Sequence, residues 1–452
     1  FHVTSATGVV YFGSSSQDKV YALDAASGNV RWTFLTGGPV RFAPTLADGR
    51  VYVGADDGCV YCLSADGGTL VWKRRIAPDE RMVPGNGRMI SLWPVRTGLV
   101  VDDGTVYGTA GLFPEEGTYL AALDAGTGEV KYRQSLRVSP QGYALASAQR
   151  LYVPTGRTNP AIFARAQGKA DGQIPSGGGA YALLIEDVLV SGPGRGAKEL
   201  QAGDVQTKDS IATFGGLRMV VAGAVAYLQS ERQLSAFDRG RYLQLSRQCV
   251  PLQRKRATLQ KELKKAQQER LPVREMTGQI EDLDRHIRRL EAGMQACYLW
   301  TVACGHPYAM IMAGRNLLVG GDNEVAAVDS ATGRTVWTGR VEGRALGLSV
   351  AQGALYVSTD TGRIHCFRSS PGRRPTKEAE GAVTDPYPKS DMTRRYRAAA
   401  DYILRQIPSP KGFCLVLDSG DGRLAWELAR RSELKVVAVD ADAERVDAAR
   451  RR

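Results

Sequence analysis

The sequence has little of what a metal centre, a membrane span or a nucleic-acid-binding surface needs. Its four histidines stand at no spacing typical of metal ligands. Neither a signal peptide nor a transmembrane helix can be read from its polar, strand-like beginning. The net charge of +12 is concentrated in two short segments, residues 240–296 with 13 basic and 7 acidic side chains and residues 368–397 with 8 and 4. The charge therefore favours local contacts at these two segments and not a nucleic-acid-binding protein.

What the sequence has is enough apolar material for more than one hydrophobic core. It contains 452 residues, of which 43% are hydrophobic, together with 51 glycines. Its first residue is Phe1 and not Met, and residues 447–452 are helical in character without a stop signal. We therefore interpret the sequence as a fragment of a longer protein.

A pattern of 13 residues returns four times along the chain, at residues 20–32, 60–72, 120–132 and 325–337. Each copy has Asp or Ser, then Gly, and an aromatic residue eight positions after the Asp or Ser. Asp or Ser bonds to the amides of a turn, and Gly adopts the left-handed backbone that other residues avoid. Each copy is therefore predicted to be a strand, a tight turn and a second strand.

A second short apolar element precedes each copy and sets the period of the repeat. Tyr11 and Tyr52 lie 41 positions apart, and Tyr107 and Tyr152 lie 45 positions apart. This spacing suits the four-stranded blade of a β-propeller. Counting the less regular starts, we predict up to eight blades, with seven as the alternative.

The Asp-x-x-Thr/Ser-Gly-x-x-x-Trp repeat resembles the quinoprotein (PQQ-like) β-propeller superfamily over about four fifths of the chain, residues 1–368. This superfamily includes quinoprotein alcohol dehydrogenases and outer-membrane assembly lipoproteins. The resemblance implies that Trp32, Trp72 and Trp337 pack between neighbouring blades as structural residues.

The catalytic members of that superfamily hold PQQ and calcium on the propeller axis, with an Asp base and two adjacent cysteines. This sequence has no adjacent pair: Cys59 and Cys62 are predicted on opposite faces of a strand. We therefore do not expect PQQ or a metal, and favour a binding or scaffolding propeller. A PQQ-dependent dehydrogenase and a non-enzymatic assembly scaffold of the cell envelope remain the alternatives.

The last blade is incomplete in sequence, because residues 363–367 end where the Asp turn and the Trp strand should follow. We expect it to contain three strands, with its closing strand upstream of Phe1.

Residues 240–296 interrupt one blade at the position of its turn. Apolar residues recur there at spacings of three and four on both sides of Pro272, which predicts an antiparallel coiled-coil hairpin. Cys249 and Cys297 are expected near one another at its base, where geometry decides whether a disulfide forms. Its basic surface either contacts a partner or solvates the helices.

Residues 369–397 are predicted to be a basic, Pro-containing linker, and residues 398–452 the start of an α/β domain. Residues 413–418 and 435–440 are predicted strands, with a glycine turn and a helix over residues 424–431 between them. This segment resembles motif I of class I S-adenosylmethionine-dependent methyltransferases. By that resemblance Gly420 and Gly422 approach the cofactor, Asp418 lies beside its amino-acid end, and Asp440 binds its ribose.

The first alternative is dinucleotide binding, although Ala425 stands at the third glycine position of that motif. The second is a truncated Rossmann-like half without cofactor. Such a domain needs roughly six strands and this segment has two, so we name no catalytic residue or methyl acceptor and expect the piece alone neither to bind cofactor well nor to fold stably.

The sequence thus predicts a PQQ-like propeller that acts as a binding or scaffolding module, fused to an S-adenosylmethionine-dependent methyltransferase-like domain. A protein partner would bind its face or the hairpin. The superfamily suggests the periplasm or cell envelope, whereas the cofactor suggests the cytoplasm.

Overall fold

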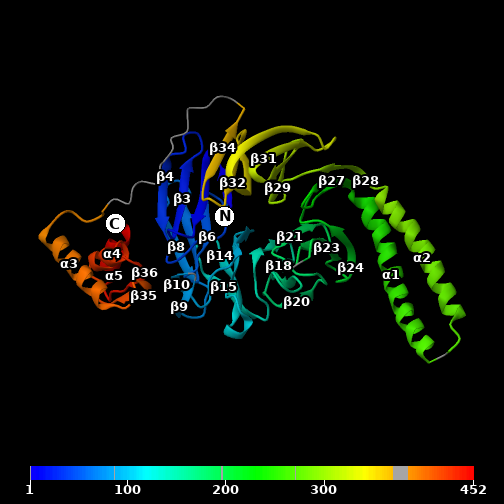
Figure 1. Ribbon diagram of the computed structural model, residues 1–452, viewed down its shortest axis with the longest axis horizontal. Helices are drawn as coiled ribbons and strands as arrows, with labels where there is room; N and C mark the ends of the chain where they lie inside the picture. Colours follow the sequence, from blue (N-terminus) through cyan, green and yellow to red (C-terminus); the bar gives the residue numbers. More distant parts are fainter. Residues whose placement is uncertain (1, 86, 195–196, 270, 370–384) are drawn as a thin grey trace. The chain divides into compact units, whose positions relative to one another are not determined.

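The computed structural model describes residues 2–85, 87–194, 197–269, 271–369 and 385–452 (Figure 1). The chain forms two compact units, and each is described here by itself. The larger unit contains residues 1–81 and 91–374, and the smaller contains residues 82–90 and 375–452.

The larger unit consists of consecutive antiparallel sheets of three or four strands, which are its blades. The first four blades are β1–β4, β5–β8, β12–β15 and β17–β20, and the next four are β21–β24, β25–β28, β29–β32 and β32–β34. The long strand β32 belongs to both of the last two blades.

The strand bounds are β1 (Val3–Ala6), β2 (Val9–Ser14), β3 (Lys19–Asp24), β4 (Val30–Leu35), β5 (Thr45–Ala47), β6 (Arg50–Gly54), β7 (Cys59–Ser64), β8 (Leu70–Arg75), β9 (Met82–Gly85), β10 (Arg88–Ser91), β11 (Thr97–Gly98), β12 (Val100–Asp102), β13 (Thr105–Ala110), β14 (Thr118–Asp124), β15 (Val130–Leu136), β16 (Gly142–Tyr143), β17 (Leu145–Ala146), β18 (Arg150–Val153), β19 (Ala161–Ala164), β20 (Ala170–Gln173), β21 (Tyr181–Ile185), β22 (Val188–Gly192), β23 (Glu199–Asp204), β24 (Ser210–Gly215), β25 (Arg218–Ala222), β26 (Val225–Gln229), β27 (Gln233–Asp238), β28 (Tyr298–Ala303), β29 (Ala309–Ala313), β30 (Asn316–Gly320), β31 (Asp322–Asp329), β32 (Thr335–Ala351), β33 (Ala354–Thr359) and β34 (Ile364–Arg368).

The blades form a closed ring, because the first strand of each blade packs against that of the next. The ring closes where β1 meets the second half of β32, and there Ser5 and Ser349 share a hydrogen bond of 2.6 Å between their hydroxyl oxygens. Val3, Val10 and Tyr356 form a buried cluster across this junction. The last blade is thus the neighbour of the first.

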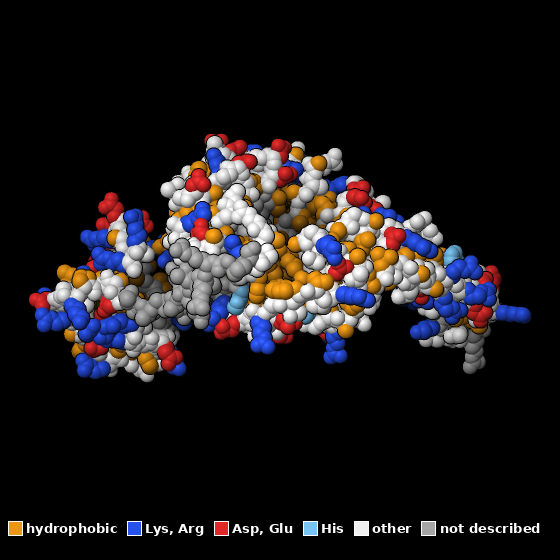
Figure 2. Space-filling model, turned by 90° about the horizontal axis from the view of Figure 1, so that it is seen from above, with side chains coloured by type: hydrophobic (Ala, Val, Ile, Leu, Met, Phe, Trp, Pro, Cys, Tyr) orange, Lys and Arg blue, Asp and Glu red, His pale blue; other side chains and the backbone are white. Residues whose placement is uncertain are grey.

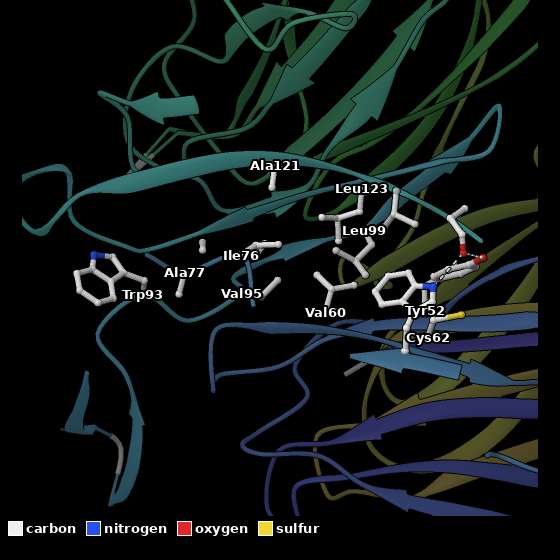
Figure 3. Close-up of a cluster of buried hydrophobic side chains, with 14 residues drawn as sticks. Tyr52, Val60, Cys62, Ile76, Ala77, Trp93, Val95, Leu99, Ala121 and Leu123 are labelled. Carbon is white, nitrogen blue, oxygen red and sulfur yellow. Dashed lines mark hydrogen bonds between the residues drawn. The ribbon is translucent and has the colours of Figure 1, made fainter. Parts of the chain in front are cut away.

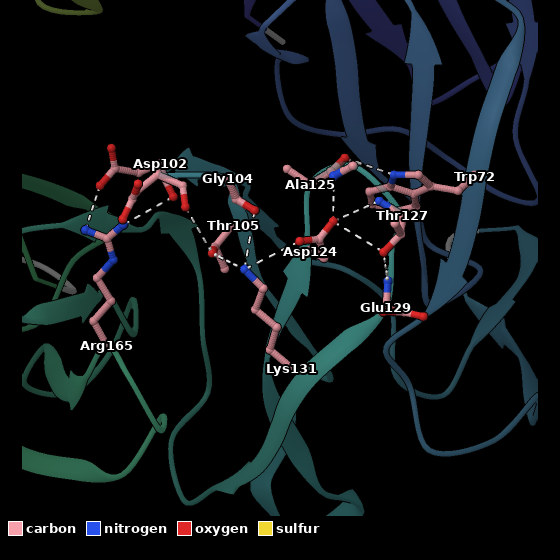
Figure 4. A network of polar contacts seen from close by, with 12 residues as sticks. Trp72, Asp102, Gly104, Thr105, Asp124, Ala125, Thr127, Glu129, Lys131 and Arg165 are labelled. Atoms are coloured by element: carbon pink, nitrogen blue, oxygen red, sulfur yellow. Dashed lines mark hydrogen bonds and ion pairs between the residues drawn. The ribbon is translucent and has the colours of Figure 1, made fainter.

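The predicted Asp turn joins the third and fourth strands of a blade, as Figure 4 shows for the third blade. One oxygen of the Asp124 carboxylate accepts the amides of Gly126 and Thr127, both at 2.9 Å. Gly128 has a φ of +74°, which a residue with a side chain adopts only with strain. These local bonds explain why the turn could be predicted from sequence alone.

Behind four of the described turns an aromatic side chain packs one blade against the next, as in the cluster of the second and third blades (Figure 3). The Trp72 indole lies against Gly128, so close that a Cβ there would be 2.6 Å from the ring, and its Nε1 donates to the Ala125 carbonyl at 3.1 Å. The Tyr52 hydroxyl donates to the same carbonyl at 3.1 Å. An aromatic ring, the glycine and the carbonyl three residues before it form what we call the aromatic latch.

Three other junctions have the same aromatic latch. At each of them an aromatic side chain donates a hydrogen bond to a carbonyl and packs on the glycine three residues later. The aromatic residue, the carbonyl residue and the glycine are Trp32, Ala65 and Gly68 at one junction, Tyr132, Arg165 and Gly168 at another, and Trp300, Ser330 and Gly333 at the third. Trp32 and Trp72 therefore lie between blades as predicted. Trp337 does not: it is 38% exposed and packs edge-on against Phe367, because among the described residues the last blade has no Asp turn to receive it.

The last blade has three strands in the described part of the chain, with β34 at its outer edge. This agrees with the sequence expectation for that blade; the origin of its closing strand stays a prediction.

The predicted helical hairpin is inserted between β27 and β28 as α1 (Arg239–Gln268) and α2 (Arg274–Gln295). Asp238, which stands at the turn position of the repeat, caps α1 by accepting the Arg241 amide at 3.0 Å. Cys249 packs inside the hairpin and Cys297 in the neighbouring blade cluster, and all seven cysteines are free thiols.

The smaller unit contains the β9–β10 pair and a parallel pair, β35 (Lys411–Val416) and β36 (Glu433–Ala438). Its helices are α3 (Asp391–Gln406), α4 (Arg423–Ala429) and α5 (Ala443–Arg451). The predicted linker ends too late, because Ser390 caps α3 and the helix begins at Asp391. Residues 370–384 of that linker lie outside the described residues.

Candidate functional site

Three aromatic side chains from different parts of the ring meet near its axis. Tyr143, at the entry to the fourth blade, packs edge-on against Phe42 and His2, with ring centroids 5.2 and 5.6 Å apart. Its hydroxyl accepts the amide of Ala43 at 3.1 Å. The first and fourth blades are not neighbours in the ring, so residues from both can meet only across its axis.

Glycine allows Tyr143 to lie there. A Cβ on Gly98 would stand 2.2 Å from the tyrosine ring, in the short parallel pair β11–β16. Burial raises the pKa of the Tyr143 hydroxyl, so the group stays neutral. Tyr143, Phe42 and His2 therefore form an aromatic cluster toward the axis, in which Tyr143 and His2 keep exposed surface.

The buried carboxylate of Asp56 is already paired with two arginine side chains. Asp56 is fully buried, and its two oxygens accept the guanidinium groups of Arg41 at 2.7 Å and Arg96 at 2.8 Å. In the part of the chain that the structure describes, no three His, Cys, Asp or Glu side chains are arranged to hold a metal ion. The described residues thus offer no set of ligands for the calcium ion of such a cofactor, and in this respect they do not fit PQQ with calcium.

A cavity of about 560 Å³ opens beside the seventh blade, lined by Gly305, His306, Asp322, Asn323, Glu324, Arg340 and Val341. The His306 imidazole bonds to Glu324 at 3.0 Å and to the Cys304 thiol at 3.7 Å. A Cβ on Gly321 would stand 2.7 Å from the imidazole, so this glycine lets the ring approach. Burial raises the pKa of Cys304, which keeps the thiol a neutral donor. Cys304, His306 and Glu324 therefore form one polar side of the cavity, and the Cys304 thiol is not a thiolate nucleophile.

Figure 2 shows hydrophobic side chains in a hollow of the larger unit and basic side chains on the helical hairpin. None of the described helices is long and apolar enough to span a membrane.

In the smaller unit, the structure brings the predicted cofactor loops together. Gly420 follows β35 and Asp440 follows β36, and the Gly420 amide donates to an Asp440 carboxylate oxygen at 2.7 Å. The other oxygen accepts the Asp442 amide at 2.9 Å. These two backbone bonds, that of Asp442 foremost, hold the pKa of Asp440 below its usual range. Asp440 is therefore ionised at neutral pH, as a ribose-binding carboxylate must be.

The other two predicted residues hold the loop in shape. Gly422 caps α4 with a φ of +83°, and a Cβ there would stand 3.0 Å from the Tyr387 hydroxyl. Asp418 has a φ of +50°, which is uncommon for a residue with a side chain. Phe413, Leu415 and Leu417 expose more than half of their surface on one face of β35.

Comparison with known proteins identifies the propeller. The model of a family described as "Outer membrane protein assembly factor BamB" matches residues 2–92, 60–241 and 321–447. The chain belongs to this family. A curated relative, the outer membrane protein assembly factor BamB of Yersinia pestis, is 29% identical over 134 residues, which are 28% of this chain and 32% of the relative. The match thus spans about a third of the relative's length.

Three solved structures share the fold at TM-scores above 0.5. The computationally designed protein Ika8 is 10% identical, with a TM-score of 0.55 over 81% of this chain and 95% of that one. A quinohemoprotein alcohol dehydrogenase of Pseudomonas putida HK5 is 13% identical, with a TM-score of 0.52 over 88% of this chain and 78% of that one. A europium-containing methanol dehydrogenase is 11% identical, with a TM-score of 0.52 over 79% of this chain and 81% of that one. The predicted PQQ-like propeller is confirmed, and at these identities the likeness concerns the fold alone.

Two features escaped the sequence analysis because they depend on long-range packing. His306 stands two residues after Cys304, but Glu324 lies 18 residues further along the chain, and no spacing in the sequence links it to the other two. Tyr143 stands outside the repeated pattern. The available signal was the sequence Pro-Gln-Gly before Tyr143, at a place where two other blades have Pro-Val-Arg, at residues 39–41 and 94–96.

Proposed function

We propose that the propeller acts as a binding or scaffolding module for a protein partner, in the periplasm or elsewhere in the cell envelope. The family description and the name of the Yersinia pestis relative, an assembly factor, support this function. The observation that carries the proposal is the contact of Tyr143 with Phe42 and His2, which places an aromatic cluster, and not a set of charged ligands, toward the ring axis.

Phe113 is the most suitable reporter on that surface. It is 61% exposed in the loop between β13 and β14, on the face where blades are entered. The loop is anchored, because Trp93 Nε1 donates to the Glu116 carbonyl at 2.6 Å.

The test places a photoreactive phenylalanine analogue at position 113 in cells, with the exposed Leu271 at the hairpin tip as the matched control position. We expect a crosslinked adduct of one defined mass from position 113. No adduct from either position would contradict a partner-binding module.

The runner-up function is a PQQ-dependent dehydrogenase, which the fold of two structural neighbours favours. The aromatic cluster opposes it. We expect no calorimetric binding of PQQ with calcium to the intact chain; stoichiometric binding would restore this alternative.

For the smaller unit the proposal is S-adenosylmethionine binding by Asp418, Gly420, Gly422 and Asp440, as in a methyltransferase-like domain. The ionised Asp440 beside the Gly420 loop supports it. Nothing in the similarities to known proteins supports it, or the cytoplasmic location that it suggested. Dinucleotide binding at the same loop remains the alternative.

Calorimetric titration distinguishes these cofactors. A longer form that completes the two-stranded sheet is expected to bind S-adenosylmethionine more tightly than NAD, and Asp440→Asn is expected to weaken the binding. The 452-residue chain itself is expected to bind weakly, and micromolar affinity would contradict that expectation.

A further inference from the structure

The helical hairpin lies outside the residues that the family model matches. Those matches end at residue 241 and resume at residue 321, whereas α1 and α2 together span residues 239–295. Figure 1 shows both helices projecting from the sheets of the larger unit. The family description therefore gives no role to the hairpin, and its chemistry must be inferred from its own side chains.

The two helices of the hairpin differ in charge. α1 has nine basic side chains and one acidic side chain, that of Glu262. α2 has four basic and five acidic side chains, so its charges nearly cancel. The positive charge of the hairpin therefore lies on α1. Because charge on a helix often serves only to solvate it, the placement of these side chains decides what they do.

A row of basic side chains on α1 lies on the side away from α2. Leu245 and Leu252 pack in the seam between the helices. Arg247 and Arg254 stand two positions after these leucines, which is about 200° around the helix axis. Lys261 follows seven positions after Arg254 and continues the same row. All three basic residues are exposed, so the row faces outward from the hairpin.

The base of this row is already paired with carboxylates. The Arg247 guanidinium lies 3.6 Å from the Asp204 carboxylate, and the Arg254 guanidinium lies 4.0 Å from the Asp209 carboxylate. Both aspartates border the turn between β23 and β24 in the fifth blade. The fifth blade thus compensates the first part of the row, and the row pairs with anions where they are within reach.

Beyond the fifth blade the positive charge has little compensation. Lys261 and Lys264 are exposed, and neither forms an ion pair within the described residues. The Lys265 ammonium lies 3.8 Å from the carboxylate of Glu269 on its own helix, and both side chains are at least half exposed. Such exposed pairs are weak, so this lysine also stays available. We call Lys261, Lys264 and Lys265 the basic face.

The basic face lacks the anchors of a protein interface. Binding between proteins depends mainly on a few buried aromatic, arginine and apolar side chains. On the described part of the hairpin, the one large apolar side chain that is exposed is Leu271, at the tip and beyond the basic face. An anionic lipid surface needs no such anchor, because it attracts each nearby lysine through charge. The aliphatic stems of lysine also suit the headgroup region.

We propose that the basic face of α1 docks on the surface of a bilayer that contains anionic phospholipids. The three ammonium groups pair with headgroup phosphates, and the hairpin lies on the membrane surface. This inference goes beyond the proposed function, because the docking needs no protein partner. The cell-envelope location of the proposed function would supply such a surface.

The first test measures sedimentation of the intact chain with phosphatidylcholine vesicles that contain or lack phosphatidylglycerol. Each lysine near an anionic surface strengthens binding about five-fold, so we expect the vesicles with phosphatidylglycerol to bind at least about ten-fold more tightly. This preference is expected to disappear at about 1 M salt, where charges are screened beyond about 3 Å.

Two triple variants test whether the basic face is responsible. The first combines Lys261→Gln, Lys264→Gln and Lys265→Gln. The matched control combines Arg285→Gln, Arg288→Gln and Arg289→Gln, at exposed positions of α2. Both variants remove three positive charges from the hairpin. We expect at least about ten-fold weaker binding to the anionic vesicles in the first variant and less than about three-fold in the control. Circular dichroism verifies that both variants are folded.

Three outcomes would overturn the proposal. Equal binding to the two kinds of vesicle would exclude recognition of anionic lipid. Equal losses in the two variants, or unchanged binding in the first, would assign the effect to net charge or to another part of the chain. Tighter binding of soluble poly-glutamate than of vesicles, at equal concentration of negative charge, would make the basic face a protein-binding surface. Adducts from position 113 that persist in any of these cases would leave the scaffold function standing.

Discussion

Removing the Trp72 ring tests whether the aromatic latch holds the blades together. Trp72 is 8% exposed and packs with Tyr52, Leu99 and Leu123 between the second and third blades (Figure 3). Replacing a core aromatic residue by Ala costs about 3–5 kcal/mol of unfolding free energy. The lost indole bond adds little, because Tyr52 still donates to the same carbonyl. We therefore expect Trp72→Ala to lose about 3–5 kcal/mol.

Trp337→Ala is the matched control. The residue stands at the same repeat position, but it is 38% exposed and its ring contact is with Phe367, at 5.1 Å between centroids. An aromatic pair of this kind contributes about 0.5–1.5 kcal/mol. We expect a loss of about 1 kcal/mol, well below that of Trp72→Ala.

The assay is urea unfolding followed by circular dichroism, together with alkylation of Cys62. This thiol lies opposite Trp72 in the sheet, and burial raises its pKa. Trp72→Ala should make Cys62 reactive in the folded protein, whereas Trp337→Ala should not. Equal stability losses in the two variants, with Cys62 unreactive in both, would refute the latch as the element that joins the blades.

Three further predictions concern the turns, the hairpin and the smaller unit. Hydrogen bonds hold the pKa values of Asp24, Asp124 and Asp329 below the usual 3.8: the largest cause is the Arg31 guanidinium at Asp24, the Thr127 amide at Asp124 and the Thr332 hydroxyl at Asp329. The stability that these carboxylates contribute is therefore present above about pH 4 and lost as the pH falls further. The triple Asn variant should show a smaller drop in melting temperature between pH 5 and pH 2, and an unchanged drop would exclude this cause. Ile287 lies in the buried seam of the hairpin, and Ile287→Ala should lower the unfolding free energy of the hairpin by about 2–5 kcal/mol. Leu271→Ala, at the exposed tip, should lower it by less than about 0.5 kcal/mol. Hydrogen exchange of the amides of α1 and α2 measures both changes. Gly422→Ala should unfold the smaller unit at lower urea than Gly420→Ala, because a Cβ at Gly420 meets open space; the reverse order would contradict the cap.

Sequence reasoning predicted what short-range chemistry determines. The Asp turns, the strands of a blade, the hairpin broken at Pro272 and the parallel strand pair of the smaller unit all follow from patterns that repeat or continue along the sequence. Their positions agree with the structure to within a few residues, as for the second strand, predicted at 435–440 and found as β36. The bond between the Gly420 amide and Asp440 was not predicted, although the two residues lie at the same edge because parallel strands end at one edge of a sheet.

Contacts between distant blades were not predictable in this way. The Trp337 side chain has the repeat pattern but lacks the next turn, so its exposure depends on residues outside its own blade. Tyr143 meets His2 because the ring closes, and closure depends on all the blades together. The helical start at Asp391 was missed for a different reason: the charged and Pro-containing composition around it obscured the cap at Ser390.

The insertion in the sixth blade shows how the fold presents a rigid arm without disturbing the ring. The Asp238 amide donates to the Cys297 carbonyl at 2.9 Å, as the Asp24 amide does to Asn29 at 2.7 Å in an uninterrupted turn. The register of β27 and β28 therefore continues through Ala236 and Trp300, and the latch to Ser330 stays closed. The Ser246 hydroxyl donates to the Ile211 carbonyl at 2.8 Å and fixes the base of the hairpin on the fifth blade. The hairpin is thus held at two neighbouring blades, and an arm fixed in this way would lose little conformational entropy on binding.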